Sequence, residues 1–293
     1  MVGQCGAQPC RCSKGAICVC ANTEVRFWSQ NRKIAIMNAK HSRLGIEPVR
    51  IGMLTPSSNT VLEPETQALI APLGARATVH FGRFRVTQIG LDAEADSQFA
   101  LEPILAAADL LADAKLDLIA WNGTSASWRG FDSDHRLCAE IEARTGIPAT
   151  SSILSLNAAM GAIGLRRLGL VTPYTSDVQQ AIMNTYAESG IEIVSEAHAG
   201  RRNNFSFAEI SSQDVQDMCR KVAIAQPEAI AIVCTNMQGA RLCTGLEAEL
   251  GIPVFDSVAV TLWGCLQRCG IQTHDLRSFG QVFELKPQWM TTE

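Results

Sequence analysis

Short apolar runs alternate with amphipathic stretches from residue 49 to about residue 270. The short runs are apolar throughout, as expected for buried strands, and the longer stretches carry apolar residues at helical spacing. In the first half, strands are predicted at Val49–Thr55, Val79–Val86, Leu116–Trp121 and Pro148–Ser151, and helices at Asp92–Lys115, Asp134–Thr145 and Leu154–Gly164. Apolar strands that alternate with helices predict parallel sheets covered by helices, an α/β fold.

The second half repeats this order of elements. Strands are predicted at Leu168–Thr172, Ile191–Ala197, Ala229–Cys234 and Pro253–Asp256, and helices at Asp177–Ser189, Ser212–Gln226, Ala240–Leu250 and Val258–Cys269. Three segment pairs match at offsets of 117, 111 and 105 residues: IGMLTP with LGLVTP, LIAWNGTS with the segment around Cys234, and TGIPATSS with LGIPVFDS. Self-similarity at a nearly fixed offset indicates a duplicated unit.

The duplication predicts two pseudo-symmetric lobes, each a parallel sheet flanked by helices, with the active site in the cleft between them. The first lobe is expected at 49–156, completed by the C-terminal segment at about 257–285, and the second at 157–256. Ligands of open parallel sheets bind beyond the carboxyl ends of the strands. The candidate segments for chemistry are therefore the polar strand ends at 56–60, 122–125, 173–176 and 234–236.

Cys234 ends a predicted buried strand and precedes a predicted helix. Backbone N–H groups of the following residues and a nearby helix N-terminus would favour its thiolate. A free cysteine is more often a packed core residue, and Cys243, Cys265 and Cys269 are interpreted in that way. Cys234 is interpreted as functional because it falls where this fold binds ligands.

The other strand ends offer neutral hydrogen-bond donors. The segments 57–60 and 123–127 carry hydroxyl groups and backbone N–H groups, and neither contains Lys or Arg. Such donors suit a carboxylate, or an enediolate that forms from one, although the same residue types also cap helices. Tyr174 follows Pro173 at a strand end, where a phenol can donate to a carboxylate oxygen; a surface turn is the alternative.

Composition narrows the function classes. The 293 residues carry a net charge of −4, which argues against a nucleic-acid partner. No apolar run is long enough to span a membrane, and no secretory signal is visible, so the 11 cysteines are predicted to be reduced in a cytoplasmic protein. Residues 1–48 are interpreted as a disordered or non-native extension, with a start at Met37 as one explanation and a zinc site on the CxC pairs as a less favoured alternative.

Four motifs carry a family resemblance: PSSNT (56–60), NGTSASWRG (122–130), TPYTSDV (172–178) and VCTN (233–236). Over about residues 49–270 the chain resembles the aspartate/glutamate racemase superfamily, in its branch of maleate cis–trans isomerases and arylmalonate decarboxylases. The resemblance implies two pseudo-symmetric α/β halves and chemistry without cofactor or metal. Racemases and isomerases of this kind carry one cysteine from each half. Here the second-half position is Cys234 and the first-half position is Gly123, which puts two-base racemisation in doubt.

The decarboxylases show the same pattern of one glycine and one cysteine. By this resemblance Gly123, Thr124, Ser125, Tyr174 and the Thr235 backbone N–H would bind the substrate and its enediolate, and Cys234 would protonate the enediolate. The isomerases resemble the chain at other positions, because their substrate-binding asparagines and tyrosine correspond to Asn59, Tyr174 and, by a weaker local match, Asn204.

The leading expectation is a cofactor-independent lyase that resembles arylmalonate decarboxylase and acts on a small carboxylic or dicarboxylic acid. One alternative is a maleate isomerase-like enzyme with Cys234 as nucleophile. The other is a non-catalytic protein that binds a small acid. No nucleic-acid or membrane partner and no metal are expected, and a homo-oligomer stays open because related proteins are often oligomeric.

Overall fold

The computed structural model describes residues 47–288, which lie within one compact unit, Leu44–Glu293. The predictions for the N-terminal extension, its start at Met37 and its zinc-like cysteine spacing concern residues outside this range.

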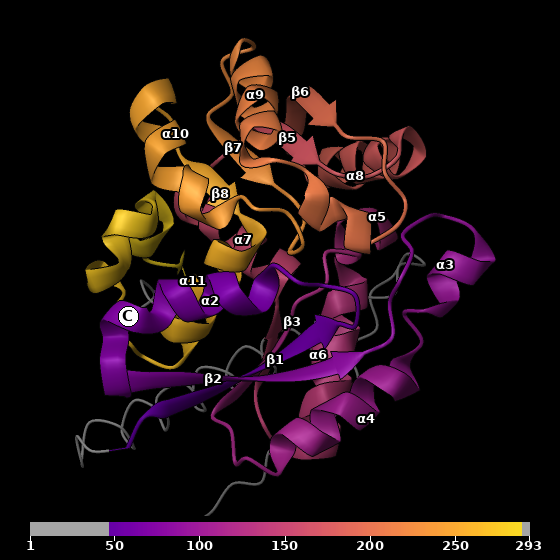
Figure 1. Ribbon diagram of the computed structural model, residues 1–293, viewed down its shortest axis with the longest axis vertical. Coiled ribbons are helices and arrows are strands. Elements are labelled where there is room, and N and C mark those ends of the chain that lie inside the picture. Colours follow the sequence, from indigo (N-terminus) through magenta and orange to yellow (C-terminus); the bar gives the residue numbers. More distant parts are fainter. Residues whose placement is uncertain (1–46, 289–293) are drawn as a thin grey trace, which may run out of the picture. The chain divides into compact units, whose positions relative to one another are not determined.

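Two four-stranded parallel sheets form the framework (Figure 1). The first has the order β2-β1-β3-β4 and the second the order β6-β5-β7-β8, so the two sheets share one topology. The strands are β1 Val49–Pro56, β2 Ala77–Phe84, β3 Leu118–Trp121, β4 Ala149–Ser151, β5 Arg167–Thr172, β6 Glu192–His198, β7 Ala229–Ile232 and β8 Val254–Asp256. The predicted α/β fold with two duplicated lobes is confirmed.

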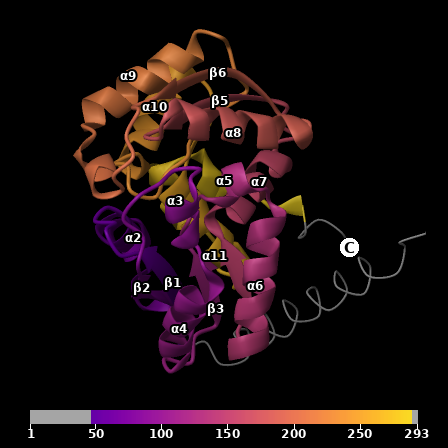
Figure 2. The same cartoon turned by 90° about the vertical axis from the view of Figure 1, so that its right-hand side faces the viewer.

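Helices cover both sheets (Figure 2). Those of the first half are α2 Leu62–Ile70, α3 Ala93–Ser97, α4 Leu101–Ala112, α5 Ala126–Arg129, α6 Asp132–Thr145 and α7 Ser152–Ala162. Those of the second half are α8 Ser176–Glu188, α9 Ser212–Ala223, α10 Cys243–Leu250 and α11 Ser257–Arg268. Short 3₁₀ segments lie at Ala71–Arg76, Phe205–Glu209, Ala240–Leu242, His274–Phe279 and Gln281–Glu284.

The last helix of each half crosses to the other half. Helices α7 and α11 pack against each other, and α11 also contacts α2 and β3 of the first sheet. On the other side, the Tyr186 hydroxyl of α8 donates to Asn157 Oδ1 of α7 at 3.3 Å. This exchange joins the two sheets around the helix pair. The residue boundaries predicted for the two lobes stay a prediction.

The duplication extends to individual hydrogen bonds. At the start of β1 the backbone N–H of Arg50 donates to Asp117 Oδ2 at 2.9 Å, and at the start of β5 that of Arg167 donates to Glu228 Oε2 at 3.0 Å. Beyond β3 the Asn122 N–H bonds the Leu54 carbonyl, and beyond β7 the Val233 N–H bonds the Val171 carbonyl.

In the first of these pairings, Arg50 and Arg167 are 117 residues apart, and the acids Asp117 and Glu228 are 111 residues apart. These are the same offsets as those of the sequence repeats. The second pairing aligns Gly123 with Cys234, because each follows the residue whose N–H bonds the neighbouring strand.

The prediction of one long helix over Asp92–Lys115 is wrong in one respect. The structure divides it into α3 and α4, with a break at residues 98–100. Pro103 has no N–H to donate to the carbonyl of Phe99, so the second helix starts just before it. Four strand ends also differ by two residues: β2 begins and ends earlier than predicted, β3 begins later, and Cys234 lies two residues beyond the end of β7.

Candidate active site

The loop after β1 meets the loop after β7 through Asn59. Its Nδ2 donates to Thr235 Oγ1 at 3.1 Å, and its Oδ1 accepts the N–H groups of Val61 and Leu62 at the start of α2. The side chain is 1% exposed. Asn59 therefore caps a helix of one lobe and holds the cysteine loop of the other, so that its amide has little freedom to turn.

Two further contacts join the lobes on either side of Gly123. Thr235 Oγ1 donates to the carbonyl oxygen of Asn122 at 3.0 Å. The hydroxyl groups of Thr124 and Tyr174 are 2.6 Å apart. Because Thr235 follows Cys234 and Thr124 follows Gly123, the two equivalent positions of the repeat face the same junction between the lobes.

The Cys234 thiol is buried, with 3% of the residue exposed. Burial raises the pKa of this thiol to about 12, although the backbone N–H of Asn236 and the Tyr174 hydroxyl both act to lower it. The Asn236 N–H donates to Cys234 Sγ at 3.3 Å. The thiol is therefore protonated in the closed site at neutral pH, with donors in place to receive the thiolate once the proton has left.

Tyr174 is buried rather than in a surface turn. Burial raises the pKa of its phenol, as does the neighbouring Cys234, so the hydroxyl stays neutral and able to donate. Its ring packs edge-on against Trp128 at 5.3 Å and Phe207 at 5.5 Å between ring centres. This packing fixes the direction of the hydroxyl group.

Asn204 and Asn236 form a second polar connection between the lobes. Asn204 Nδ2 donates to Ser58 Oγ at 2.8 Å, and Asn236 Nδ2 donates to the Asn204 carbonyl at 2.6 Å. Asn236 Oδ1 accepts the backbone N–H of Thr60 at 3.0 Å. Sequence reasoning placed Asn236 at a functional strand end but gave its side chain no role; its position directly after Cys-Thr was the available signal.

The site is lined by neutral donors. Within residues 47–288 the backbone N–H groups of Thr124, Ser125 and Thr235 have no hydrogen-bond partner, and these three residues are 6% exposed or less. The basic side chain of Arg83 donates to the carbonyls of Ser57 and Asn59. Such an arrangement binds an anion through oriented dipoles and strengthens as water is excluded.

Comparison with known proteins identifies the family. The model of the arylmalonate decarboxylase family matches residues 51–283.

The chain belongs to the arylmalonate decarboxylase family.

Its relatives include the maleate isomerase of Geobacillus stearothermophilus, 24% identical over 239 residues that cover 77% of this chain and 93% of the relative. The arylmalonate decarboxylase of Bordetella bronchiseptica is also 24% identical, over 80% of this chain and 96% of its own. Among solved structures, a cysteine-to-serine variant of the Nocardia farcinica maleate cis–trans isomerase with a covalently bound succinylcysteine gives a TM-score of 0.74 at 21% identity. It covers 80% of this chain and 98% of that one. The predicted branch of the superfamily is confirmed, and its members are enzymes.

At the first-lobe position, the Trp121 side chain fills the space next to Gly123. A Cβ atom on this glycine would lie 2.1 Å from Cζ2 of the Trp121 indole. Trp121 is 1% exposed. Sequence reasoning missed Trp121 as a site residue, although it ends the strand only two residues before Gly123.

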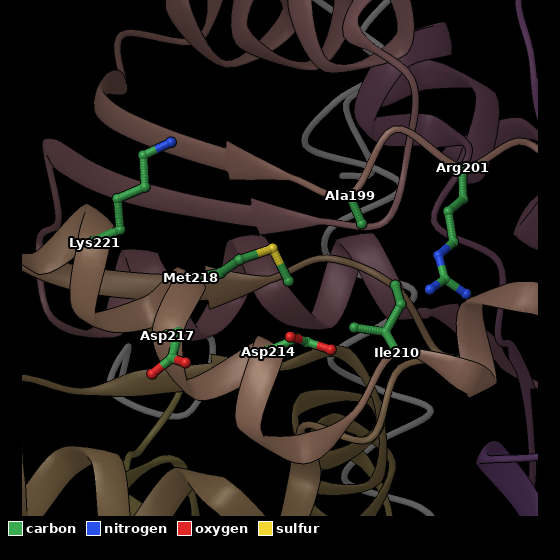
Figure 3. A pocket seen from close by; sticks show the side chains of 7 residues that line it. All are labelled: Ala199, Arg201, Ile210, Asp214, Asp217, Met218 and Lys221. Atoms are coloured by element: carbon green, nitrogen blue, oxygen red, sulfur yellow. The ribbon is translucent and has the colours of Figure 1, made fainter.

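Other features of the described chain do not involve the candidate site residues. Residues 47–288 contain no group of three or more His, Cys, Asp or Glu side chains that could hold a metal, and no helix there is long and apolar enough to cross a membrane. A pocket of about 410 Å³ borders α9 and is lined by Ala199, Arg201, Ile210, Asp214, Asp217, Met218 and Lys221 (Figure 3). None of its residues belongs to the predicted site.

Proposed function

We propose that this protein is a cofactor-independent lyase that decarboxylates a small malonate-type dicarboxylic acid, with Cys234 as its proton donor. One observation carries the proposal: a single buried thiol lies at the lobe junction, and the equivalent first-lobe position is Gly123, which has no proton to exchange. The family membership and the decarboxylase relative support it. The substrate-binding roles of Asn59, Thr124, Ser125, Tyr174, Asn204 and Thr235 are part of this proposal.

The reaction proceeds in two steps. The bond between the α-carbon and one carboxylate breaks, carbon dioxide leaves, and the electron pair moves into the remaining carboxylate to give an enediolate. The Tyr174 and Thr124 hydroxyls and the free N–H groups of Ser125 and Thr235 stabilise this enediolate. The Cys234 S–H then transfers its proton to the α-carbon, and the thiolate regains a proton from water.

The protonation state of Cys234 supports this reaction. A pKa of about 12 keeps the thiol protonated at neutral pH, which a proton donor requires. A nucleophile would have to lose this proton before it attacked, and the described part of the site contains no basic side chain in contact with the sulfur to take it. Donation to a developing carbanion needs no such base.

The test is a panel of disubstituted malonates and maleate incubated with the protein in heavy water, followed by NMR and carbon dioxide release. Decarboxylation should release one carbon dioxide and leave one deuterium at the α-carbon of the product. The absence of carbon dioxide release from every malonate would contradict the proposal. Ligand-dependent thermal stabilisation without turnover would indicate a binding protein instead.

A maleate isomerase-like activity is the second candidate, and the hydrogen bonds of Asn59 and Asn204 favour it. The Asn59 amide is held at the lobe junction by Thr235, and the Asn204 amide by Ser58. From these positions the two amides would bind the two carboxylates of a four-carbon diacid. In this reaction the sulfur adds to the double bond, the single bond so formed rotates, and elimination returns the thiolate. Fumarate from maleate, with a covalent adduct on Cys234 in mass spectrometry, would identify it.

A cytoplasmic location is proposed with the function. All cysteines in the described range are free, including Cys138 and Cys219 in the two lobes. Unpaired buried thiols are typical of proteins in a reducing compartment.

A further inference from the structure

Trp121 and Gly123 form a matched pair at the end of β3. Trp121 is the last residue of β3 and Gly123 follows two residues later, with the indole in the space that a side chain at position 123 would enter. A Cβ at position 123 would lie 2.1 Å from Cζ2, 2.4 Å from Cε2 and 2.8 Å from Nε1 of the indole. Real Cβ atoms do not approach other heavy atoms so closely, so no side chain fits at position 123 while the indole keeps its place.

The second lobe has different residues at the two equivalent positions. By the 111-residue offset, Trp121 corresponds to Ile232 and Gly123 to Cys234. One lobe has a large ring before the site and no side chain at it, whereas the other has a smaller aliphatic residue before the site and a thiol at it. The bulk at the first-lobe position is therefore supplied by the residue two positions earlier.

Aromatic packing holds the indole there. Its ring centre lies 4.8 Å from that of Phe84 and 6.4 Å from that of Phe99, and the Phe99 ring in turn contacts Trp128 beside Tyr174. Within the described chain the buried indole Nε1 makes no hydrogen bond of normal geometry, although it lies close enough to the Asp134 carboxyl group to act to lower the pKa of that group. Ring contacts with Phe84 and Phe99 therefore hold Trp121 in position, together with its polar interaction with Asp134.

We propose that the Trp121 indole closes the first-lobe face of the bound acid, opposite the Cys234 thiol, and so determines which face of the substrate receives the proton. This inference rests on the single-thiol chemistry proposed above. It assigns Trp121 as a specificity-determining residue, with Gly123 present because the indole needs its space. It follows that a cysteine placed at position 123 cannot act as a second acid–base group until the indole is removed.

The structural part is tested by a double-mutant cycle of Trp121→Ile, which copies Ile232, and Gly123→Ala, which adds one carbon. Gly123→Ala alone should lower Tm by about 2–10 °C because of overpacking, and the same change should cost little in the Trp121→Ile background. Equal Tm changes in both backgrounds would overturn the proposed matched pair. If Trp121→Ile does not fold, Trp121→Phe, whose ring is shorter, takes its place in the cycle.

The stereochemical part uses 2-methyl-2-phenylmalonate and enantiopure 2-phenylpropanoate as probes. The natural protein should give one enantiomer, and Trp121→Ile should lower the enantiomeric ratio by about tenfold or more. Racemisation of the product, with α-deuterium exchange, should appear in Trp121→Ile with Gly123→Cys but not in Gly123→Cys alone. Racemisation by Gly123→Cys alone, or an unchanged enantiomeric ratio in Trp121→Ile, would overturn the inference.

These arms separate the two proposals. If the natural protein releases no carbon dioxide from any malonate, the proposed function fails, and the thermal cycle still decides whether the indole and the glycine are coupled. If decarboxylation occurs but the enantiomeric ratio does not depend on Trp121, the function stands and the further inference fails.

Discussion

The two lobes share a strand order and a pattern of backbone hydrogen bonds, yet they place different side chains at the junction between them. Beyond β7 the second lobe presents Cys234, with the Asn236 N–H on its sulfur. Beyond β3 the first lobe presents Gly123, with the Trp121 indole across it. The duplicated backbone supplies loops and free N–H groups in both halves, whereas the reactive side chain is present in only one.

This difference shows which parts of a duplicated fold are interchangeable. Glu142 and Glu247 each accept the N–H of the residue seven positions later, Ala149 or Val254, so these acids perform one backbone task in both lobes. Buried backbone groups must be paired in every copy of the fold. No such requirement applies to a side chain at the cleft, so that position can change with the chemistry.

The largest expected effect comes from removal of the one thiol at the junction. Cys234→Ala should reduce decarboxylation by about 10²–10⁴-fold, because it removes the proposed proton donor. Cys219→Ala is the matched control, since this buried cysteine of α9 lies outside the predicted site. Rates are measured by carbon dioxide release, and the folded state of each variant by its Tm. Comparable rates for the two variants would refute a special role of the second lobe.

The next largest effect concerns the phenol that meets the first-lobe loop. Tyr174→Phe removes the hydroxyl that lies 2.6 Å from Thr124 Oγ1. We expect kcat to fall by about 10²–10³-fold, as for the loss of one oxyanion donor, with a smaller change in KM. Steady-state kinetics with the malonate probe measure both values. A change in KM alone would indicate that the hydroxyl binds the ground state only.

The helix caps that follow β4 and β8 predict a pH effect on stability. Ser151 Oγ accepts the Leu154 N–H, whereas at the equivalent place Asp256 Oδ1 accepts the N–H groups of Val258 and Ala259. Burial raises the pKa of Asp256 to about 7 from its ordinary value of 3.8. The folded state therefore holds the Asp256 carboxyl proton more tightly than the unfolded state. The contribution of this proton to the free energy of unfolding is lost as the pH rises from about 4 through 7.

Asp256→Asn keeps an oxygen for the cap but cannot ionise. The free energy of unfolding of the variant should fall less between pH 5 and pH 8 than that of the natural protein, by on the order of 2–4 kcal/mol. Urea unfolding at the two pH values measures this difference. Asp134→Asn is the first-lobe comparison, because burial also raises the pKa of Asp134 to about 7. An unchanged pH dependence in both variants would show that these carboxyl groups ionise freely.

The smallest expected effects distinguish Ser125 from Asn236, which occupy equivalent positions. The Asn236 side chain joins the lobes through Thr60 and Asn204, so Asn236→Ala should lower the free energy of unfolding by about 1–3 kcal/mol. The Ser125 hydroxyl makes no hydrogen bond within residues 47–288. Ser125→Ala should therefore change the free energy of unfolding by less than about 0.5 kcal/mol while reducing activity. Denaturant unfolding and rate measurements on both variants check this; equal losses of stability would contradict it.

Several site residues were predictable because their signals are local. Cys234 and Tyr174 follow apolar runs, and parallel sheets gather such positions at one edge. Asn59 lies in a strand-end segment selected from the residues, but its substrate role came from the family resemblance, as did Asn204 altogether; the structure places both at the lobe junction, and their substrate roles stay predictions. The break before α4 was missed because apolar periodicity continues across it, although Pro103 marked the boundary.

The sequence alone determined the duplication, the α/β fold and the presence of one thiol opposite a glycine, because strand periodicity, repeat offsets and residue identity can be read along the chain. Only the tertiary structure decided that the space at Gly123 is filled, that burial raises the pKa of the Cys234 thiol, and that Asn236 joins the lobes. Each of these depends on side chains from separate segments that meet in a buried junction. Burial, ring packing and hydrogen bonding there are properties of the folded arrangement, and no single stretch of sequence contains them.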